Sequence, residues 1–145
     1  MRKIIIHGDD SSVLSVRLED ILNCFETRGN EVFWGLLWVY ATITQEEDCD
    51  ILKFEGEINK SKHGKLISLG KMLNLFSKID QAIELLMIGD SNVENIRRYE
   101  SDELMYENCE YIIELVDSSY WLVCSKDGGF IQNIFEKIQG VEYEN

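Results

Sequence analysis

The spacing of apolar residues in the first third of the chain predicts a strand, a helix and a second strand. Residues 3–7 (KIIIH) are a short apolar run closed by GDDSS, which predicts a buried strand followed by a helix N-cap. Apolar residues then recur at helical spacing from Leu14 to Phe25. Residues 32–44 are apolar on both alternating faces, which predicts a covered central strand with Trp34 and Trp38 on the same face.

The middle of the chain predicts a strand, a helix, a further strand and two short helices. From residue 50 to 58, apolar and charged residues alternate, which is typical of a half-exposed antiparallel strand. Helical spacing over residues 68–79 and an apolar run over 82–88 predict a helix and a buried strand. Residues 91–94 (SNVE) have the form of a capping box with Ser91 as the cap, and residues 101–108 predict another short helix.

The last part of the chain predicts a hairpin and a helix. Residues 110–117 and 120–125 flank Ser118-Ser119, and Asp127-Gly128-Gly129 opens an amphipathic stretch that ends at Gly140. The order β-α-β-β-α-β-β-β-α resembles a split βαβ start followed by a hairpin and a helix. We therefore expect an α+β fold, a mostly antiparallel sheet packed against about three main helices, in one domain over residues 1–145.

Composition indicates the class of protein and its cellular location, but it does not indicate a catalytic activity. A chain of 145 residues with 45% hydrophobic residues can bury its own core. Its longest nearly apolar stretch, residues 32–43, is too short to span a membrane, and the start is too short for a signal peptide, so we expect a cytoplasmic protein. The four cysteines lack CxxC spacing and predict buried thiols rather than a metal site.

The motif Gly89-Asp90-Ser91 follows a predicted strand and resembles the first block of the SGNH (GDSL-type) hydrolases. That resemblance implies a serine nucleophile whose base comes from an Asp-x-x-His near the C-terminus. This chain has no His after residue 63, and a serine without a base is a poor nucleophile. We therefore interpret Ser91 as a turn and cap residue, and we predict no catalytic residue and no cofactor.

One possible enzyme site remains as an alternative. His7, Asp9 and Asp10 lie at the end of the first predicted strand, where carboxylates bind cations in many α/β folds. The same residues also form an ordinary strand-to-helix loop with a cap. A small hydrolase or metal-dependent enzyme using these three residues is therefore the rival to a non-enzymatic function.

The distribution of charge is the strongest functional signal. The net charge is −13, which disfavours binding to nucleic acids and anionic membranes and favours cationic partners. No basic residue lies between Arg98 and Lys126, whereas residues 58–79 contain five lysines and no acid. Acids and tyrosines interleave in the basic-free stretch, and we predict that a basic protein binds there. The predicted partner-binding residues are Glu100, Asp102, Glu103, Tyr106, Glu107 and Glu110. A solvated surface with its tyrosines in the core is the alternative.

In size, acidity and lack of catalytic motifs, the whole chain resembles the immunity proteins of contact-dependent growth inhibition and related bacterial toxin systems. That resemblance implies a protein that binds a cognate basic toxin domain, often a nuclease, and occludes its active site or nucleic-acid-binding face. Residues 109–127 also resemble the C-terminal part of an uncharacterised bacterial domain, which implies no activity. The leading hypothesis is an inhibitor of a cationic toxin, and an adaptor for another basic protein is a further alternative.

Overall fold

The computed structural model describes residues 1–8, 15–26, 31–42, 49–77 and 81–144. The strands are β1 (Arg2–Ile6), β2 (Phe33–Thr42), β3 (Lys65–Leu66), β4 (Gln81–Asp90), β5 (Tyr111–Val116), β6 (Tyr120–Ser125) and β7 (Val141–Tyr143). The helices are α1 (Leu18–Leu22), α2 (Cys49–Lys60), α3 (Leu69–Phe76), the 3₁₀ helix η1 (Val93–Asn95), α4 (Asp102–Asn108) and α5 (Gly128–Lys137). The predicted α+β class is confirmed.

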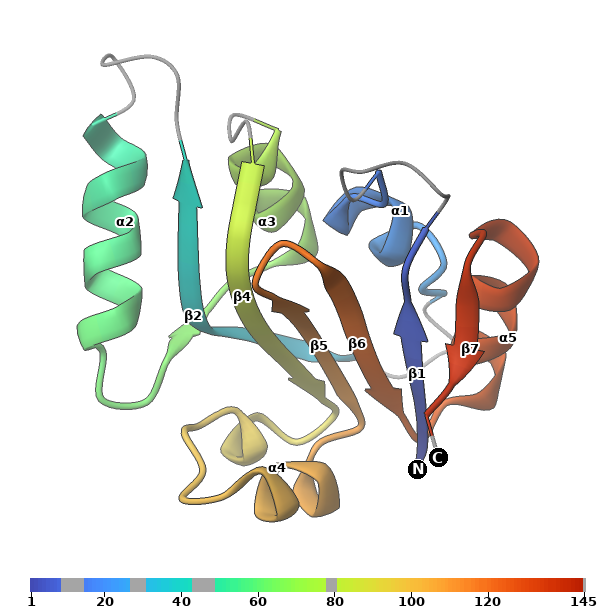
Figure 1. Ribbon diagram of the computed structural model, residues 1–145. Coiled ribbons are helices and arrows are strands. Elements are labelled where there is room, and N and C mark those ends of the chain that lie inside the picture. Colours follow the sequence, from blue (N-terminus) through green and yellow to red (C-terminus); the bar gives the residue numbers. More distant parts are fainter. Residues whose placement is uncertain (9–14, 27–30, 43–48, 78–80, 145) are drawn as a thin grey trace.

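All seven strands form one antiparallel sheet in the order β3-β2-β4-β5-β6-β1-β7 (Figure 1). The predicted hairpin is the β5–β6 pair, whose turn places Asp117 and Ser118 at positive φ. β1 and β2 are separated by β4, β5 and β6, so they do not form the predicted split βαβ unit. The hairpin and β4 occupy the space between them, and the final strand β7 pairs with β1.

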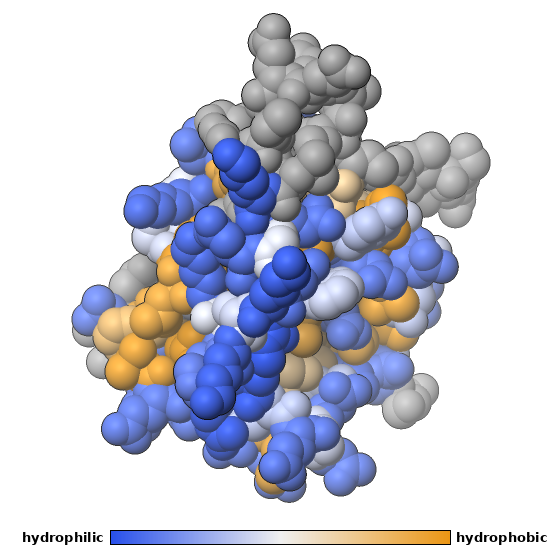
Figure 2. Space-filling model, turned by 90° about the vertical axis from the view of Figure 1, so that its left-hand side faces the viewer, coloured by the Kyte–Doolittle hydropathy of each residue, from blue (hydrophilic) through white to orange (hydrophobic). Residues whose placement is uncertain are grey.

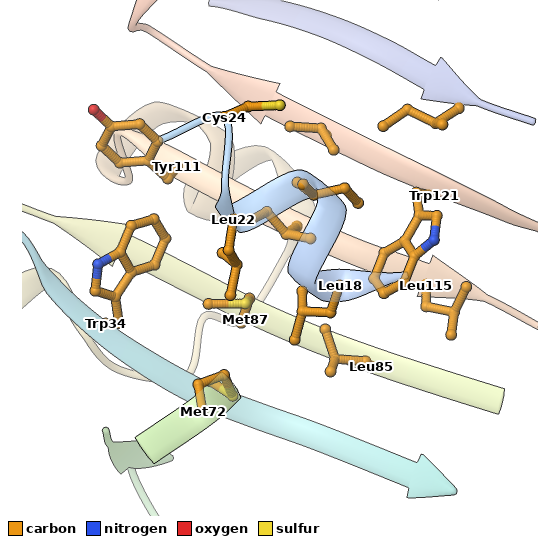
Figure 3. Packing of buried hydrophobic residues seen from close by; sticks show 14 of the residues in the cluster. Leu18, Leu22, Cys24, Trp34, Met72, Leu85, Met87, Tyr111, Leu115 and Trp121 are labelled. Carbon is orange, nitrogen blue, oxygen red and sulfur yellow. The ribbon is translucent and has the colours of Figure 1, made fainter. Parts of the chain in front are cut away.

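One face of the sheet is covered by α1, α3 and α5, which bury the larger hydrophobic cluster against it. Met72 of α3 is fully buried, as are Phe130, Ile131 and Ile134 of α5. Figure 3 shows Leu18 and Leu22 of α1 lying over Met87 and Leu115 of the sheet. The Trp121 indole donates a hydrogen bond to the carbonyl oxygen of Val16 and thereby holds the segment that leads into α1.

Among the described residues, α4 and the loop before it cover one end of the opposite face of the sheet. Ile96, Met105 of α4 and Cys109 pack there on Ile88 and Ile112 of the sheet in a second, smaller cluster. Ser101 caps α4 by accepting a hydrogen bond from the backbone N–H of Leu104. The predicted helix over residues 101–108 is therefore confirmed, and its buried side fixes α4 below the sheet in Figure 1.

The predicted strand over residues 50–58 is wrong, because this segment lies within helix α2. The alternation is interrupted at Gly56, and Ile51, Phe54 and Ile58 have the i, i+3, i+7 spacing of a helical face. α2 lies beside the edge of β2 (Figure 1), and Figure 2, which looks onto this side, shows hydrophilic residues across its middle with apolar areas to either side.

Polar side chains of α2 form hydrogen bonds with backbone N–H and carbonyl groups at the edge of β2. The Asn59 side chain accepts a hydrogen bond from the N–H of Val39 and donates one to its carbonyl oxygen, at 3.1 and 2.9 Å. The N–H of Ala41 donates a hydrogen bond to Glu55, one helical turn earlier. The helix thus satisfies the edge as a neighbouring strand would, which limits pairing with other chains.

Trp34 and Trp38 face opposite sides of the sheet, which corrects the prediction of a shared face. The pairing register of β2 with β4 shifts between Leu36 and Trp38, and such a bulge inserts one residue and reverses the alternation. Trp34 is 4% exposed in the larger cluster, whereas Trp38 is 40% exposed. Residues 33–42 form the predicted strand, and residues 43–44 of that prediction lie outside the described residues. Helix α1 occupies part of the predicted helix from Leu14 to Phe25, of which Leu14 is likewise not described.

Candidate functional site: an acidic helix and an open sheet face

The Gly89-Asp90-Ser91 motif forms a structural corner at the end of β4. A Cβ atom at Gly89 would lie 2.6 Å from the Trp34 ring, so the position requires glycine. Asp90 is 2% exposed and accepts hydrogen bonds from the N–H groups of Asn92 and Glu110 and from the Asn95 amide. These bonds fix the loop around Asp90.

The Ser91 hydroxyl donates a 2.6 Å hydrogen bond to Glu110 Oε1. The prediction that Ser91 caps the next helix is wrong, because the helix starts one residue later and Asn92 is its cap. Since Asn92 already accepts a hydrogen bond from the N–H of Glu94, the serine side chain is left to face Glu110. Among the described residues, the hydrogen-bond partner of the Ser91 hydroxyl is the Glu110 carboxylate and not the histidine imidazole that serves as the base in a Ser-His-Asp triad.

The alternative site at His7, Asp9 and Asp10 is only partly described. Asp9 and Asp10 lie outside the described residues, and the His7 ring contacts Glu142 Oε1 at 3.0 Å. Within the described ranges, no group of three or more His, Cys, Asp and Glu residues is arranged to hold a metal ion. Cys24, Cys109 and Cys124 are buried, and burial raises the pKa of all three thiols, for Cys124 to about 11. These cysteines are therefore protonated packing residues.

The predicted acids gather at the end of the sheet that carries α4. Glu100, Asp102, Glu103 and Glu107 are all exposed, and none of them forms an ion pair with a described residue. Lys126, the first base after this stretch, donates its hydrogen bond to the backbone carbonyl of Glu107. The structure thus brings four of the predicted site residues together as an uncompensated acidic surface, hereafter the α4 acids.

Tyr106 and Glu110 are placed differently from the α4 acids. Tyr106 is half-buried beside the smaller cluster, and Lys3 Nζ lies 4.8 Å from the centre of its ring. Burial raises the pKa of its hydroxyl. Glu110 accepts the Ser91 hydrogen bond at the start of β5. The Tyr106 ring therefore packs toward the sheet, as the alternative of a solvated surface with its tyrosines in the core expects.

Two further tyrosines of the basic-free stretch form hydrogen bonds within the protein through their hydroxyl groups. The Tyr99 hydroxyl donates to the carbonyl oxygen of Asn95, and the Tyr111 hydroxyl donates to Asp127. Tyr111 is 5% exposed within the larger cluster. The hydroxyl groups of Tyr99 and Tyr111 therefore hold the segments before and after α4 in place.

A second part of this sheet face lies beside the area that α4 covers, and local sequence patterns do not reveal it. Paired residues of antiparallel strands point to the same side, so the register defines a row across six strands. This open-face row runs Trp38, Leu86, Glu114, Leu122, Ile5 and Glu142. The row links residues that are far apart in the sequence, so only the register brings them together. Beside it, Tyr40 is 50% exposed and is paired with the exposed Glu84.

Glu114 is the half-buried acid at the middle of the open-face row. Burial raises the pKa of its carboxyl, and the negative charge of Asp102 raises it further, whereas Lys3 lowers it. Glu114 forms no hydrogen bond or ion pair with a described residue. A partly desolvated carboxylate without a fixed cation is electrostatically suited to receive one.

A cavity of about 380 Å³ lies between α1 and the end of α5, on the covered face of the sheet. Its charged lining residues are Asp20 and Lys137, which have opposite signs. The Asp20 carboxylate already accepts a hydrogen bond from the N–H of Arg17. The charged residues of this cavity therefore do not favour a ligand of either sign.

Comparisons with protein-family models, with curated proteins and with solved structures give no match to this chain. No helix in the part of the chain that the structure describes is long and apolar enough to cross a membrane. The α4 acids and the open-face row are therefore the candidate functional surfaces of this protein.

Proposed function

We propose that this protein is an immunity-type inhibitor that binds a cognate basic toxin domain in the cytoplasm and neutralises it by steric and electrostatic occlusion. The observation that carries the proposal is the group of α4 acids. Four exposed carboxylates lie on one end of the molecule without a compensating ion pair among the described residues.

Electrostatic repulsion among these carboxylates gives a reason to expect a partner. Glu103 and Glu107 are one helical turn apart on α4, where like charges destabilise a helix by a few tenths of a kcal/mol. A cationic protein surface relieves that repulsion on binding. The same field accelerates encounter with a positively charged partner, and a nuclease surface that binds phosphates is one such partner.

The α4 acids lie on a rigid support, which suits an inhibitor that acts by occlusion. Met105 is 4% exposed and fixes α4 to the sheet, and Arg98 ties the preceding loop to the end of α2 by donating to the carbonyl oxygens of Ile58 and Ser61. A preformed surface loses little conformational entropy on binding, which favours tight association.

Co-expression tests this function. The chain is produced together with the polypeptide encoded by the adjacent reading frame, and growth and complex formation are measured. We expect the adjacent polypeptide alone to stop growth, the pair to grow, and the two proteins to purify as a complex. An adjacent polypeptide that is toxic but neither binds this chain nor is neutralised by it would contradict the proposal.

A further inference from the structure

The open-face row has the composition of a protein-binding surface rather than of an ordinary solvated sheet. At ~4.8 Å per strand spacing, its six strands span about 24 Å. Trp38 is exposed at one end, and Leu86 and Ile5 are half-buried within the row. Tryptophan and tyrosine are enriched among the residues that dominate binding energy in protein interfaces, and Trp38 lies in this row with Tyr40 beside it.

The charges along the row are mostly negative. Glu84 accepts a 3.1 Å hydrogen bond from the Trp38 indole, and Glu142 contacts His7 at the far end. The Lys3 ammonium beside the row is engaged by Glu144 at 3.0 Å. Glu114, at the centre, is the acid that no described residue pairs. The row is therefore complementary to a segment that carries positive and apolar side chains together.

We propose that the open-face row docks a Lys- or Arg-bearing segment of the partner, with one cationic side chain on Glu114 and apolar side chains on Trp38 and Leu86. This inference rests on the proposed function for the identity of the partner, but not for the chemistry of the surface. Asp102 lies close enough to Glu114 to influence its ionisation, so the row adjoins the α4 acids. The acids on α4 attract the partner, and the open face holds it.

A defined peptide tests the surface directly. Acetyl-Arg-Leu-Arg-Leu-Arg-amide is titrated into the isotopically labelled protein at low ionic strength, and backbone and indole N–H shifts are followed. Trp38 is the exposed tryptophan, whereas Trp34 and Trp121 are 4% and 2% exposed and serve as internal references. We expect the Trp38 indole and the backbone of Glu84 and Glu114 to shift with one saturating curve. The same peptide with Glu in place of Arg should leave them unchanged.

Two variants of equal net charge locate the cationic contact. Glu114→Gln should weaken peptide binding about fivefold, the effect expected for losing one partly exposed ion pair. Glu136→Gln, at an exposed position of α5 on the opposite face of the sheet, should change it less than about twofold, since an exposed charge away from the peptide contributes little. Equal weakening by both variants, or shifts confined to α4, would overturn the docking proposal.

The outcomes separate this inference from the proposed function. If the peptide binds as expected but the adjacent polypeptide is not neutralised, the docking surface stands and the toxin-inhibitor function fails. If the adjacent polypeptide is neutralised while the Trp38 indole does not respond to the peptide, the function stands and the docking site is wrong.

Discussion

The carboxylate of Asp90 accepts three hydrogen bonds and joins the end of β4 to the start of β5. The neighbouring Ser91 has one exposed contact, with Glu110. In the hydrolase motif that this stretch resembles, the serine carries the function. In this protein the aspartate has the larger role, and that role is structural.

Substitutions at these two adjacent residues should therefore differ in effect. Asp90→Ala leaves three donors without their acceptor in a part-buried corner and should lower the free energy of unfolding by about 3 kcal/mol. Ser91→Ala removes one exposed hydrogen bond and should cost less than about 1 kcal/mol. Urea denaturation of both variants measures the difference. A larger loss for Ser91→Ala, or an esterase activity that depends on Ser91, would contradict the structural role.

Glu114→Gln should stabilise the protein near neutral pH. Burial raises the folded-state pKa of this carboxyl above its ordinary value of 4.5. The protonated form is thus favoured in the folded state, and its stabilising contribution is present below pH 4.5 and is lost as pH rises through the folded pKa. Glutamine is never ionised and avoids that loss. We expect the Tm of the variant to exceed that of the parent at pH 7 and to match it near pH 4.

The control for Glu114→Gln is Glu136→Gln, at an exposed position of α5. Thermal melts of both variants and the parent at the two pH values are compared. A stabilisation of Glu114→Gln that is the same at pH 4 and pH 7 would show that ionisation of this carboxyl does not oppose folding.

At the scale of elements, the edge of β2 depends on α2. Asn59→Ala leaves the N–H and carbonyl groups of Val39 without their partner, and we expect a loss of about 2 kcal/mol in the free energy of unfolding. Asn74→Ala, at an exposed position of α3, is the matched control and should be neutral or slightly stabilising, because alanine favours helix. Equal chemical denaturation curves for the two variants would contradict the edge-sealing role of α2.

The elements predicted correctly are those whose local pattern agrees with their packing. The β5–β6 hairpin, the α5 helix and α4 each have a turn or cap signal beside a buried face, and these were recoverable from the sequence. Residues 50–58 were not, because a short stretch with both alternating and i, i+3, i+7 spacing fits a strand and a helix equally well. The shift at Trp38 was also hidden, since a bulge is defined by the partner strand.

The candidate site was only half visible in the sequence, for the same reason. The α4 acids are neighbours along the chain, so the absence of Lys and Arg from residues 99–125 reveals them. The open-face row draws single residues from six strands. The position of the open-face row depends on strand order and register, and local sequence patterns predict neither.

The whole chain has 27 acidic and 14 basic residues, and none of the four ion pairs found among the described residues includes an acid of α4. Long-range attraction to a basic partner should therefore originate mainly at the end of the molecule that carries α4. Glu142 and Glu144 are unsuitable controls for this effect because they pair with His7 and Lys3. Glu19 and Glu136 are better, since they lie in the first turn of α1 and near the end of α5, as Glu103 and Glu107 do in α4. The contact of Glu19 with Arg17 is longer, at 3.9 Å, than the 3.0 Å pairs of Glu142 and Glu144, and Glu136 forms no ion pair with a described residue.

The most direct measurement is the rate of association between this protein and the purified adjacent polypeptide as a function of salt concentration. If the α4 acids attract the partner, the association rate falls steeply with added salt while the dissociation rate changes little. The double variant Glu103→Lys/Glu107→Lys should associate more slowly and lose most of that salt dependence, and Glu19→Lys/Glu136→Lys should retain it. Equal association rates and salt dependences for the two double variants would contradict the account.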